Sequence, residues 1–351
     1  MSSSPPTTEA AGRPLAALVI APQWIGDAVM SEPLLAALAA RGERLTVGAL
    51  PWVAPIYRAM PQVAEVIELP FAHGRLQWGA RRALARQLRG RYDRAYVLPN
   101  SFKSALLPWL AGIAQRVGYR GEARWGLLTQ RLPNPPRHER PPMVDFYLAL
   151  AGQAPQGRQR PRLQVGEAAI GSALARHGLA RGAYVVFVPG AEYGPAKRWP
   201  AGHFAELARQ LAEPVAVLGS AKEAALGQDI AQASGRAEVR NLAGATTLDE
   251  AMALIAAARA VVTNDTGLMH VAAALDVPQV ALFGSSSPLH TPPLSARAQV
   301  LWLKQDPHYQ PPLDCAPCFA RSCPLGHTRC LRDLSPQRVL AALAVAQAPA
   351  G

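Results

Sequence analysis

The sequence predicts an α/β protein made of two doubly wound domains that face each other across a cleft. Short, continuous apolar runs alternate with helical segments in two separate series along the chain. A segment rich in Gly, Pro, Gln and Arg lies between the two series. At 351 residues, the chain is long enough to form two domains with a core each.

The first series begins with the apolar run LAALVIA. Strands are predicted at 15–21, 45–50, 64–69 and 94–99, a loop (PQWIGDAV) at 22–29, and a helix closed by Gly42 at 31–42. This strand–helix–strand order implies a parallel sheet with right-handed crossovers.

The segment 79–91 (GARRALARQLRGR) predicts an amphipathic helix, with Leu84 and Leu88 on one face and arginines around the other. The pattern is typical of a solvated helix on a domain surface. It also fits a helix that contacts anionic headgroups or substrate, so both interpretations stay open.

Residues 151–165 (AGQAPQGRQRPRLQV) have the composition of a linker. After them, strands are predicted at 183–190, 215–220, 260–264 and 278–284, with helices at 203–212, 248–258 and 266–276. We therefore expect an N-terminal domain at 1–165, which starts with a disordered tail at 1–13, and a C-terminal domain at 166–351. Ligands of such domains bind at the carboxyl ends of the strands, and therefore in the cleft.

The formal net charge of +12 is concentrated in the first half of the chain. Residues 1–175 hold 21 Lys and Arg against 11 Asp and Glu, and the rest holds 15 against 13. A basic half attracts nucleic acid, an acidic membrane surface, or a phosphorylated or carboxylated substrate. The N-terminal sequence has no basic secretory n-region, and no apolar run approaches the ~18 residues that span a bilayer. We expect a soluble, cytoplasmic protein, and a location at the membrane surface stays open.

The segment AVVTNDTGLMHVAAAL (260–275) predicts a phosphate site. An apolar strand leads into a polar turn, and Gly267 then opens a helix. Asp265 or Thr266 alone would suggest a simple helix cap. However, helix N-termini also bind phosphates, Gly267 permits a close approach to the backbone, and His270 follows one turn later.

A second candidate phosphate loop is PGAEYGPAKRWP (189–200), which leaves a predicted strand and enters a helix. Gly190 stands at the turn, and Lys197 is one of only four lysines in a chain that strongly prefers arginine. Lysine binds phosphate as a compact point charge. A solvated lysine beside Trp199 is the alternative, and the rarity of lysine argues against it.

On the N-terminal side, Gly26 and Asp27 lie just past the first strand. A carboxylate at this position faces the cleft, where it could deprotonate an acceptor hydroxyl. Alternatively, Asp27 caps the helix that starts a few residues later.

Three segments together, GDAVMSEPLLAAL, PGAEYGPAKRWP and NDTGLMHVAAAL…VALFGSSSP, resemble the lipopolysaccharide heptosyltransferases, and within that family the branch of heptosyltransferase II most closely. The similarity runs over nearly the whole chain. It implies a GT-B fold and the transfer of L-glycero-D-manno-heptose from ADP-heptose to the first heptose of the lipopolysaccharide inner core, with inversion at the anomeric carbon.

The resemblance also implies roles for particular residues. Asp27 would be the general base, and Lys197 would neutralise the leaving diphosphate. The remaining donor-binding residues would be Gly190, Asp265, Thr266, Gly267, Leu268 and His270. This scheme requires no metal or other cofactor.

For the acceptor, Arg120 and Arg124 in GYRGEARWGLL are the candidate ligands. The acceptor implied by the resemblance is a heptosylated Kdo–lipid A, whose carboxylates and phosphates match the basic first half. The enzyme would then work at the cytoplasmic face of the inner membrane, with peripheral contact to that surface and no nucleic-acid partner.

All four cysteines lie in CAPCFARSCPLGHTRC: Cys315, Cys318, Cys323 and Cys330. The first spacing suits a metal knuckle, with His327 as a further possible ligand, but the later spacings match no common zinc finger. Reduced structural cysteines are the favoured interpretation, and metal binding is the alternative.

Other functions fit the sequence less well. Within the family, heptosyltransferase I or another core transferase stays open. A basic nucleic-acid-binding module with a metal knuckle is disfavoured because aromatic residues make up only 6% of the chain and form no stacking platform. A nicotinamide-dependent oxidoreductase is disfavoured because neither half has a GxGxxG motif between its first strand and helix.

Overall fold

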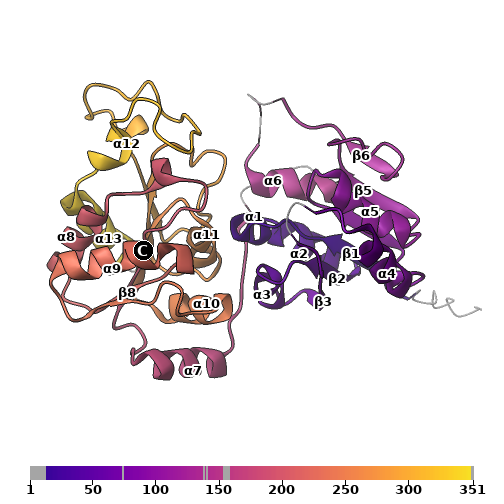
Figure 1. The fold of residues 1–351 in the computed structure, drawn as a ribbon, viewed down its shortest axis with the longest axis horizontal. Coiled ribbons are helices and arrows are strands. Elements are labelled where there is room, and N and C mark those ends of the chain that lie inside the picture. Colours follow the sequence, from indigo (N-terminus) through magenta and orange to yellow (C-terminus); the bar gives the residue numbers. More distant parts are fainter. Residues whose placement is uncertain (1–12, 73–74, 137–138, 140, 153–158, 349–351) are drawn as a thin grey trace, which may run out of the picture.

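In a computed structural model of the chain, the described residues (13–72, 75–136, 139, 141–152 and 159–348) form two α/β halves that lie side by side (Figure 1). Each half is built on a six-stranded parallel sheet. The sheet orders are β3-β2-β1-β4-β5-β6 and β12-β11-β10-β7-β8-β9. Each order starts in the middle of the sheet, runs to one edge and then returns to the other, so the predicted doubly wound architecture is confirmed in both halves.

The strands of the first sheet are short, and those at its centre are buried. They are β1 (Ala16–Ile20), β2 (Arg44–Ala49), β3 (Val63–Glu68), β4 (Arg94–Val97), β5 (Gln115–Tyr119) and β6 (Gln130–Leu132). Strand β1 pairs in parallel with both β2 and β4. Residues 17–19 of β1 have no exposed surface, as expected of a central strand covered on both faces.

The helices of the first half are α1 (Ile25–Met30), α2 (Glu32–Ala40), α3 (Ala54–Arg58), α4 (Trp78–Leu88), α5 (Phe102–Leu110) and α6 (Met143–Leu148), the last extended by the 3₁₀ turn η2 (Ala149–Ala151). The prediction of a loop at 22–29 is wrong, because α1 starts at Ile25. Its N-cap is Trp24, so Asp27 lies in the first turn of a helix and does not cap one.

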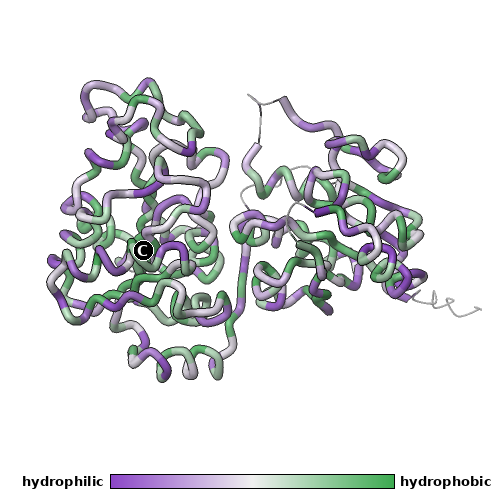
Figure 2. The backbone as a smooth tube through the Cα atoms, in the orientation of Figure 1, coloured by the Kyte–Doolittle hydropathy of each residue, from purple (hydrophilic) through white to green (hydrophobic). Residues whose placement is uncertain are grey.

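The second sheet repeats this plan with strands that are buried still more completely. They are β7 (Val185–Val188), β8 (Val215–Val217), β9 (Val239–Asn241), β10 (Ala260–Asn264), β11 (Gln279–Phe283) and β12 (Ala298–Trp302). Figure 2 shows hydrophobic residues gathered mostly inside each half and hydrophilic residues on the outside.

The helices of the second half are α7 (Glu167–His177), α8 (Ala201–Gln210), α9 (Ala224–Ser234), α10 (Leu248–Ala257), α11 (Gly267–Ala274), α12 (Arg329–Arg332) and α13 (Pro336–Gln347). Three 3₁₀ turns, η3 (Pro195–Lys197), η4 (Ala221–Glu223) and η5 (Leu303–Gln305), complete it. No helix in the described part of the chain is long and apolar enough to cross a bilayer.

The segment predicted as a linker is only partly described. Its residues 153–158 lie outside the described part of the chain, as does nearly all of the predicted tail at 1–13. The described end of the linker is fixed to both halves: the backbone N–H of Leu163 donates to Ala274 O at 3.1 Å, and that of Gln164 donates to Ala59 O at 2.8 Å. The first contact reaches α11, and the second reaches the end of α3.

Direct contact between the halves centres on α1 and α11, which face each other (Figure 1). A Cβ on Gly26 would lie 2.9 Å from His270 Cδ2, and a Cβ on Gly267 would lie 2.7 Å from Ile25 Cβ. Both distances are shorter than real Cβ contacts, so each helix approaches the other at a residue that has no side chain. The two helices therefore meet at their first turns.

Candidate active site

Three segments at the carboxyl ends of strands supply the candidate site. Helix α1, which follows β1, carries Asp27, the loop after β7 carries Lys197, and the turn after β10 leads into α11. Strands β1 and β7 occupy equivalent positions in their sheets, each beside the point where the strand order reverses. Ligands of open α/β sheets bind at this point, so the topology places the predicted residues where a ligand is expected.

The Asp27 carboxylate has no hydrogen-bond or ion-pair partner among the described residues. It keeps some solvent exposure, yet surrounding protein removes enough water for burial to raise its pKa to about 6. A carboxylate that ionises near neutral pH and has no fixed partner is suited to accepting a proton from a bound hydroxyl.

Aromatic side chains form part of the surroundings of Asp27. Burial and the Asp27 charge raise the pKa of both Tyr57, in α3, and Tyr147, in α6, so these phenols stay neutral. The Tyr57 hydroxyl lies 3.1 Å from Ser31 Oγ, which itself donates to Ala28 O at 2.7 Å. Neither tyrosine was predicted as a site residue, because no local sequence pattern links either one to Asp27.

Across the interface, the N-terminus of α11 has no side-chain cap. Thr266 is its N-cap residue in extended conformation, but its hydroxyl accepts no hydrogen bond from the first helical turn. In the second half, α10 and α13 have such a cap, from Thr247 and Ser335, whereas α7, α8, α9 and α12 also lack one. Without a side-chain acceptor, the first amides of α11 keep their capacity to bind an anion, and phosphate binding there stays a prediction.

Lys197 reaches this helix end and forms an ion pair there. Its Nζ lies 2.5 Å from Asp265 Oδ2, and both side chains are largely buried. Two residues predicted to hold the same ligand therefore bind each other. The ion pair places the Asp265 carboxylate where it can position Lys197, and its part in donor binding stays a prediction.

Asn264 joins the two phosphate loops and was not among the predicted site residues. Its Oδ1 accepts from the backbone N–H of Trp199 at 3.1 Å, and its Nδ2 donates to Pro189 O at 2.7 Å. The loop at 189–200 is thereby tied at both ends to the end of β10. An Asn immediately before the Asp-Thr-Gly segment was the available signal, since a buried amide needs backbone partners.

His270 is buried in α11, facing Gly26 of α1. Burial lowers its pKa to about 4, against the attraction of Asp265, and the nearby Lys197 lowers it further. The imidazole is therefore neutral at physiological pH and adds no charge to the site. It contributes to the contact between the two helices.

Two predicted donor residues occupy less direct positions. A Cβ on Gly190 would lie 1.9 Å from Glu223 Oε1, so this glycine makes room for the Glu223 carboxylate, which accepts from the Ser220 backbone N–H at 2.7 Å. The side chain of Leu268 packs against the apolar core. Any contact of Leu268 with a ligand would come from its backbone.

The two predicted acceptor arginines differ sharply in exposure. Arg120 is exposed, and its side chain has no recorded partner among the described residues. Arg124 is only 2% exposed; it donates to Pro99 O at 2.7 Å, to Asn100 Oδ1 at 3.1 Å and to Tyr119 O. The prediction that Arg124 grips an acceptor is therefore corrected: its guanidinium fixes the loop after β5 from inside.

The interpretation of α4 is corrected in the same way for one of its arginines. Arg81 is buried, with its Nε donating to Leu76 O at 2.7 Å and its guanidinium 4.0 Å from the centre of the Phe71 ring. Arg82 and Arg86 are exposed, as the amphipathic pattern predicted.

The chain is similar to known proteins along most of its length. A profile of glycosyltransferase family 9 (heptosyltransferase) matches residues 81–328. Lipopolysaccharide heptosyltransferase 2 of Escherichia coli K12 is 46% identical over 92% of this chain and 96% of its own. Lipooligosaccharide heptosyltransferase 2 of Haemophilus influenzae is 41% identical over 82% of this chain and 88% of its own.

A solved structure resembles the fold as well. The structure of E. coli ADP-heptose lps heptosyltransferase II has a TM-score of 0.82 and 43% identity, and the match covers 95% of this chain and 98% of that one.

The contrast between Arg120 and Arg124 gives a stability test. We expect Arg124→Ala to lower the free energy of unfolding by about 2–4 kcal/mol, because buried backbone and amide oxygens lose their donor. The matched variant Arg120→Ala should change it by less than about 0.5 kcal/mol. Urea denaturation followed by circular dichroism measures both, and equal effects would contradict the assignment.

Proposed function

The chain belongs to glycosyltransferase family 9, the heptosyltransferases, and on this premise we propose that Asp27 is its general base and that Lys197 and α11 hold the donor diphosphate. The chain is a heptosyltransferase enzyme. The observation that carries the proposal is the position of Asp27: an unpartnered carboxylate with a raised pKa, on the helix that touches the uncapped end of α11.

The proposed donor is ADP-heptose, and the reaction is a single displacement. Asp27 takes the proton from an acceptor hydroxyl while that oxygen forms a bond to the anomeric carbon. The bond from this carbon to the diphosphate oxygen breaks on the opposite face, which inverts the anomeric centre. ADP leaves with the electron pair, and the proton stays on Asp27 until solvent removes it.

The leaving diphosphate gains negative charge as the bond breaks. Lys197 and the amides of Thr266, Gly267 and Leu268 are the groups at the interface that can stabilise this charge. In the free enzyme, Asp265 holds the ammonium at this position, so the cation is in place before the donor arrives. In this proposal, residues of the chain supply the positive charge that stabilises the leaving diphosphate.

The proposed acceptor is a heptosylated Kdo–lipid A, with its first heptose presented to Asp27. Exposed aromatic residues follow five successive strands of the first sheet: Trp24, Trp52, Trp78, Phe102 and Trp125. Because the carboxyl ends of parallel strands meet at one edge, these rings lie along the edge that carries Asp27. The exposed Arg75 and Arg120 belong to the same loops.

Aromatic rings pack against sugar faces and settle at membrane interfaces, and arginine binds phosphate and carboxylate. This edge therefore supports the recognition of an anionic glycolipid and peripheral contact with the cytoplasmic face of the inner membrane. Mass spectrometry of acceptors incubated with ADP-heptose tests the acceptor. Gain of one heptose by the monoheptosylated acceptor supports the proposal, and gain only by an acceptor without heptose contradicts it.

The role of Asp27 predicts a pH dependence. We expect kcat/KM of the wild type to fall as pH decreases through about 6, because the proton acceptor becomes protonated. Asp27→Asn should reduce the rate about 10²–10⁴-fold and remove this ionisation. A variant that keeps the wild-type rate would exclude Asp27 as the base.

Asp27→Asn should also stabilise the fold. When the pKa of a carboxyl is higher in the folded than in the unfolded state, its ionisation lowers the free energy of unfolding. This loss is complete above the folded pKa, and it disappears as pH falls towards the unfolded pKa of about 4. The variant should gain about 1–3 kcal/mol above pH 6 and lose this advantage between pH 6 and pH 4. Thermal unfolding at several pH values provides the measurement.

Lys197 is tested with its partner. Lys197→Met should slow the transfer about 10²–10³-fold and also lower stability, because Asp265 becomes an unpaired buried charge. The double variant Lys197→Met/Asp265→Asn should recover the melting temperature while the rate stays low. If activity returned together with stability, Lys197 would have only a structural role.

The contact between the helices predicts a steric effect. Gly267→Ala should reduce kcat/KM at least about tenfold, because its Cβ would overlap Ile25 and push α1 away. Gly171→Ala is the matched control, since this exposed glycine in α7 has no neighbouring atom within 4 Å of an added Cβ. The control should keep its activity and gain about 0.5–1 kcal/mol of stability.

A further inference from the structure

We propose that the four cysteines of segment 315–330 bind one thiolate-preferring metal ion, for which Zn²⁺ is the test ion. The heptosyl transfer described above does not use these residues. The proposed ligands are Cys315, Cys318, Cys323 and Cys330, which are all the cysteines of the chain and are all unpaired as thiols.

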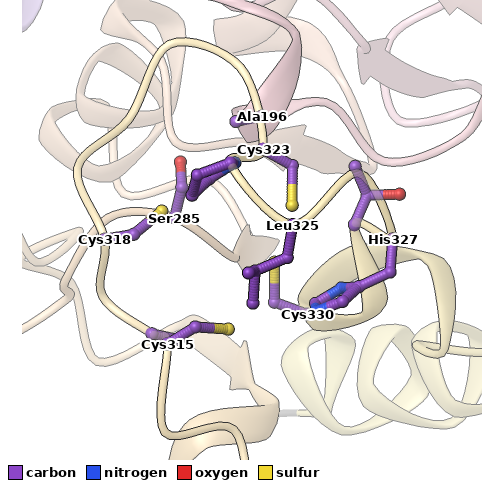
Figure 3. Close-up of a pocket in the computed structure, with 11 residues that line it drawn as sticks. Ala196, Ser285, Cys315, Cys318, Cys323, Leu325, His327 and Cys330 are labelled. Atoms are coloured by element: carbon purple, nitrogen blue, oxygen red, sulfur yellow. The ribbon is translucent and has the colours of Figure 1, made fainter.

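The four cysteines surround one small cavity. Figure 3 shows them on different sides of the cavity, which Ser285 and His327 also line. Its volume is about 20 Å³, enough for a single water-sized occupant. A site of this size fits one ion.

The backbone of the cysteine loop is shaped around this cavity. Phe319, directly after the C-x-x-C pair, has a φ of 51°, which costs a non-glycine residue energy. The strained turn is held by the Phe319 N–H, which donates to Ser285 O at 2.7 Å. A left-handed residue at this position lets the chain turn back around the two thiols.

A second turn presents amides to Cys323. The backbone N–H groups of residues 325–328 are directed at its sulfur as hydrogen-bond donors. Several N–H groups directed at one sulfur stabilise a thiolate, which is the form that binds metal. A neutral structural cysteine has no need of such a nest.

Cys330, in α12, is partly buried and lines the same cavity as the other three cysteines. Four thiolates at one cavity repel each other unless a cation compensates their charge. A divalent ion provides this compensation, and each thiol releases its proton on binding.

An independent observation points to an occupant. Ser285 is only 2% exposed and lines the cavity, yet its Oγ has no hydrogen-bond partner in the described part of the chain. Buried hydroxyls are normally satisfied by protein, water or a ligand. The hydroxyl is placed to donate to a metal-bound sulfur.

The thiols need to rearrange to bind the ion. Among residues 13–72, 75–136, 139, 141–152 and 159–348, no three His, Cys, Asp or Glu side chains form a finished metal-binding group. Cys318 is exposed, so rotation of its side chain and closure of the loop can complete the set. The ion would thus order the loop as it binds.

The loop is attached to the donor side of the active site. The Ala196 N–H donates to Arg321 O at 3.0 Å, and the Tyr193 hydroxyl donates to Phe319 O at 2.9 Å. Gly194 allows this contact, because a Cβ there would lie 2.4 Å from Arg321 O. Ordering the cysteine loop therefore orders the segment that carries Lys197. This consequence rests on the proposed function, whereas the metal site does not.

The test uses the full-length protein, purified under reducing conditions and supplied with Zn²⁺, then desalted. We expect about one Zn²⁺ per chain by inductively coupled plasma mass spectrometry, and protection of all four thiols from a thiol-specific reagent until a chelator is added. Because the chain has no other cysteines, the thiol count reports on this site alone. Cys323→Ser and Cys330→Ser should each lose the ion.

His327→Ala is the control that lines the same cavity, and it should retain the ion. Stripping and restoring Zn²⁺ in the wild type should lower and then recover the melting temperature, a readout that holds even if a cysteine variant fails to fold. Failure of the wild type to retain Zn²⁺, with four freely reactive thiols, would overturn the proposal. Loss of the ion in His327→Ala would overturn the all-cysteine ligand set. If Zn²⁺ bound but did not change kcat/KM of the heptosyl transfer, only the link to the active site would be refuted.

Discussion

The contact between the first turns of α1 and α11 is the constraint on which the site depends. Gly26 and Gly267 lie where any side chain would overlap the opposite helix. This close approach brings a carboxylate from one half next to a helix N-terminus from the other. Neither half contains the complete proposed site, because the proposed base and the proposed anion-binding groups belong to different halves. The two sheets share one strand order, so both helices start at equivalent topological positions.

The charged groups on the two sides of this contact differ in their surroundings, and the difference fits the roles proposed for them. Asp27 has no partner among the described residues, and burial raises its pKa towards the range in which a base can exchange protons. Lys197 is paired with Asp265 and held by a loop that Asn264 fixes at both ends. A base must change its charge during the reaction, whereas a group that stabilises a phosphate must keep its charge and position. Neutral His270 packs against Gly26 and adds no charge to this contact.

The eight strands predicted from the sequence are all present, and so is the two-domain architecture, because buried parallel strands appear as apolar runs. Strands β5, β6, β9 and β12 were not predicted, because they are short or mix polar and apolar residues, as in Gln115–Tyr119 and Val239–Asn241. It also placed Asp27 in a loop, since α1 is too short to show helical periodicity. Candidate site residues that directly follow a strand in the sequence could be named from the sequence. Other features depend on tertiary packing and could not: the tyrosines near Asp27 (Tyr57 and Tyr147) and the pairing of Lys197 with Asp265. Arg124 shows that an arginine in a polar loop can be buried.

The cysteine segment lies beside the loop that carries Lys197. The loop with Lys197 forms no long helix or strand; it has only the 3₁₀ turn Pro195–Lys197. Such a loop needs external support to keep a cation within an ångström of its working position. Asn264 supports the ends of the loop, and residues 319–321 support its middle through Tyr193 and Ala196. A segment without regular structure can hold the Lys197 loop no more rigidly than the segment itself is held. A cross-link within the cysteine loop would therefore act directly on the position of the Lys197 ammonium.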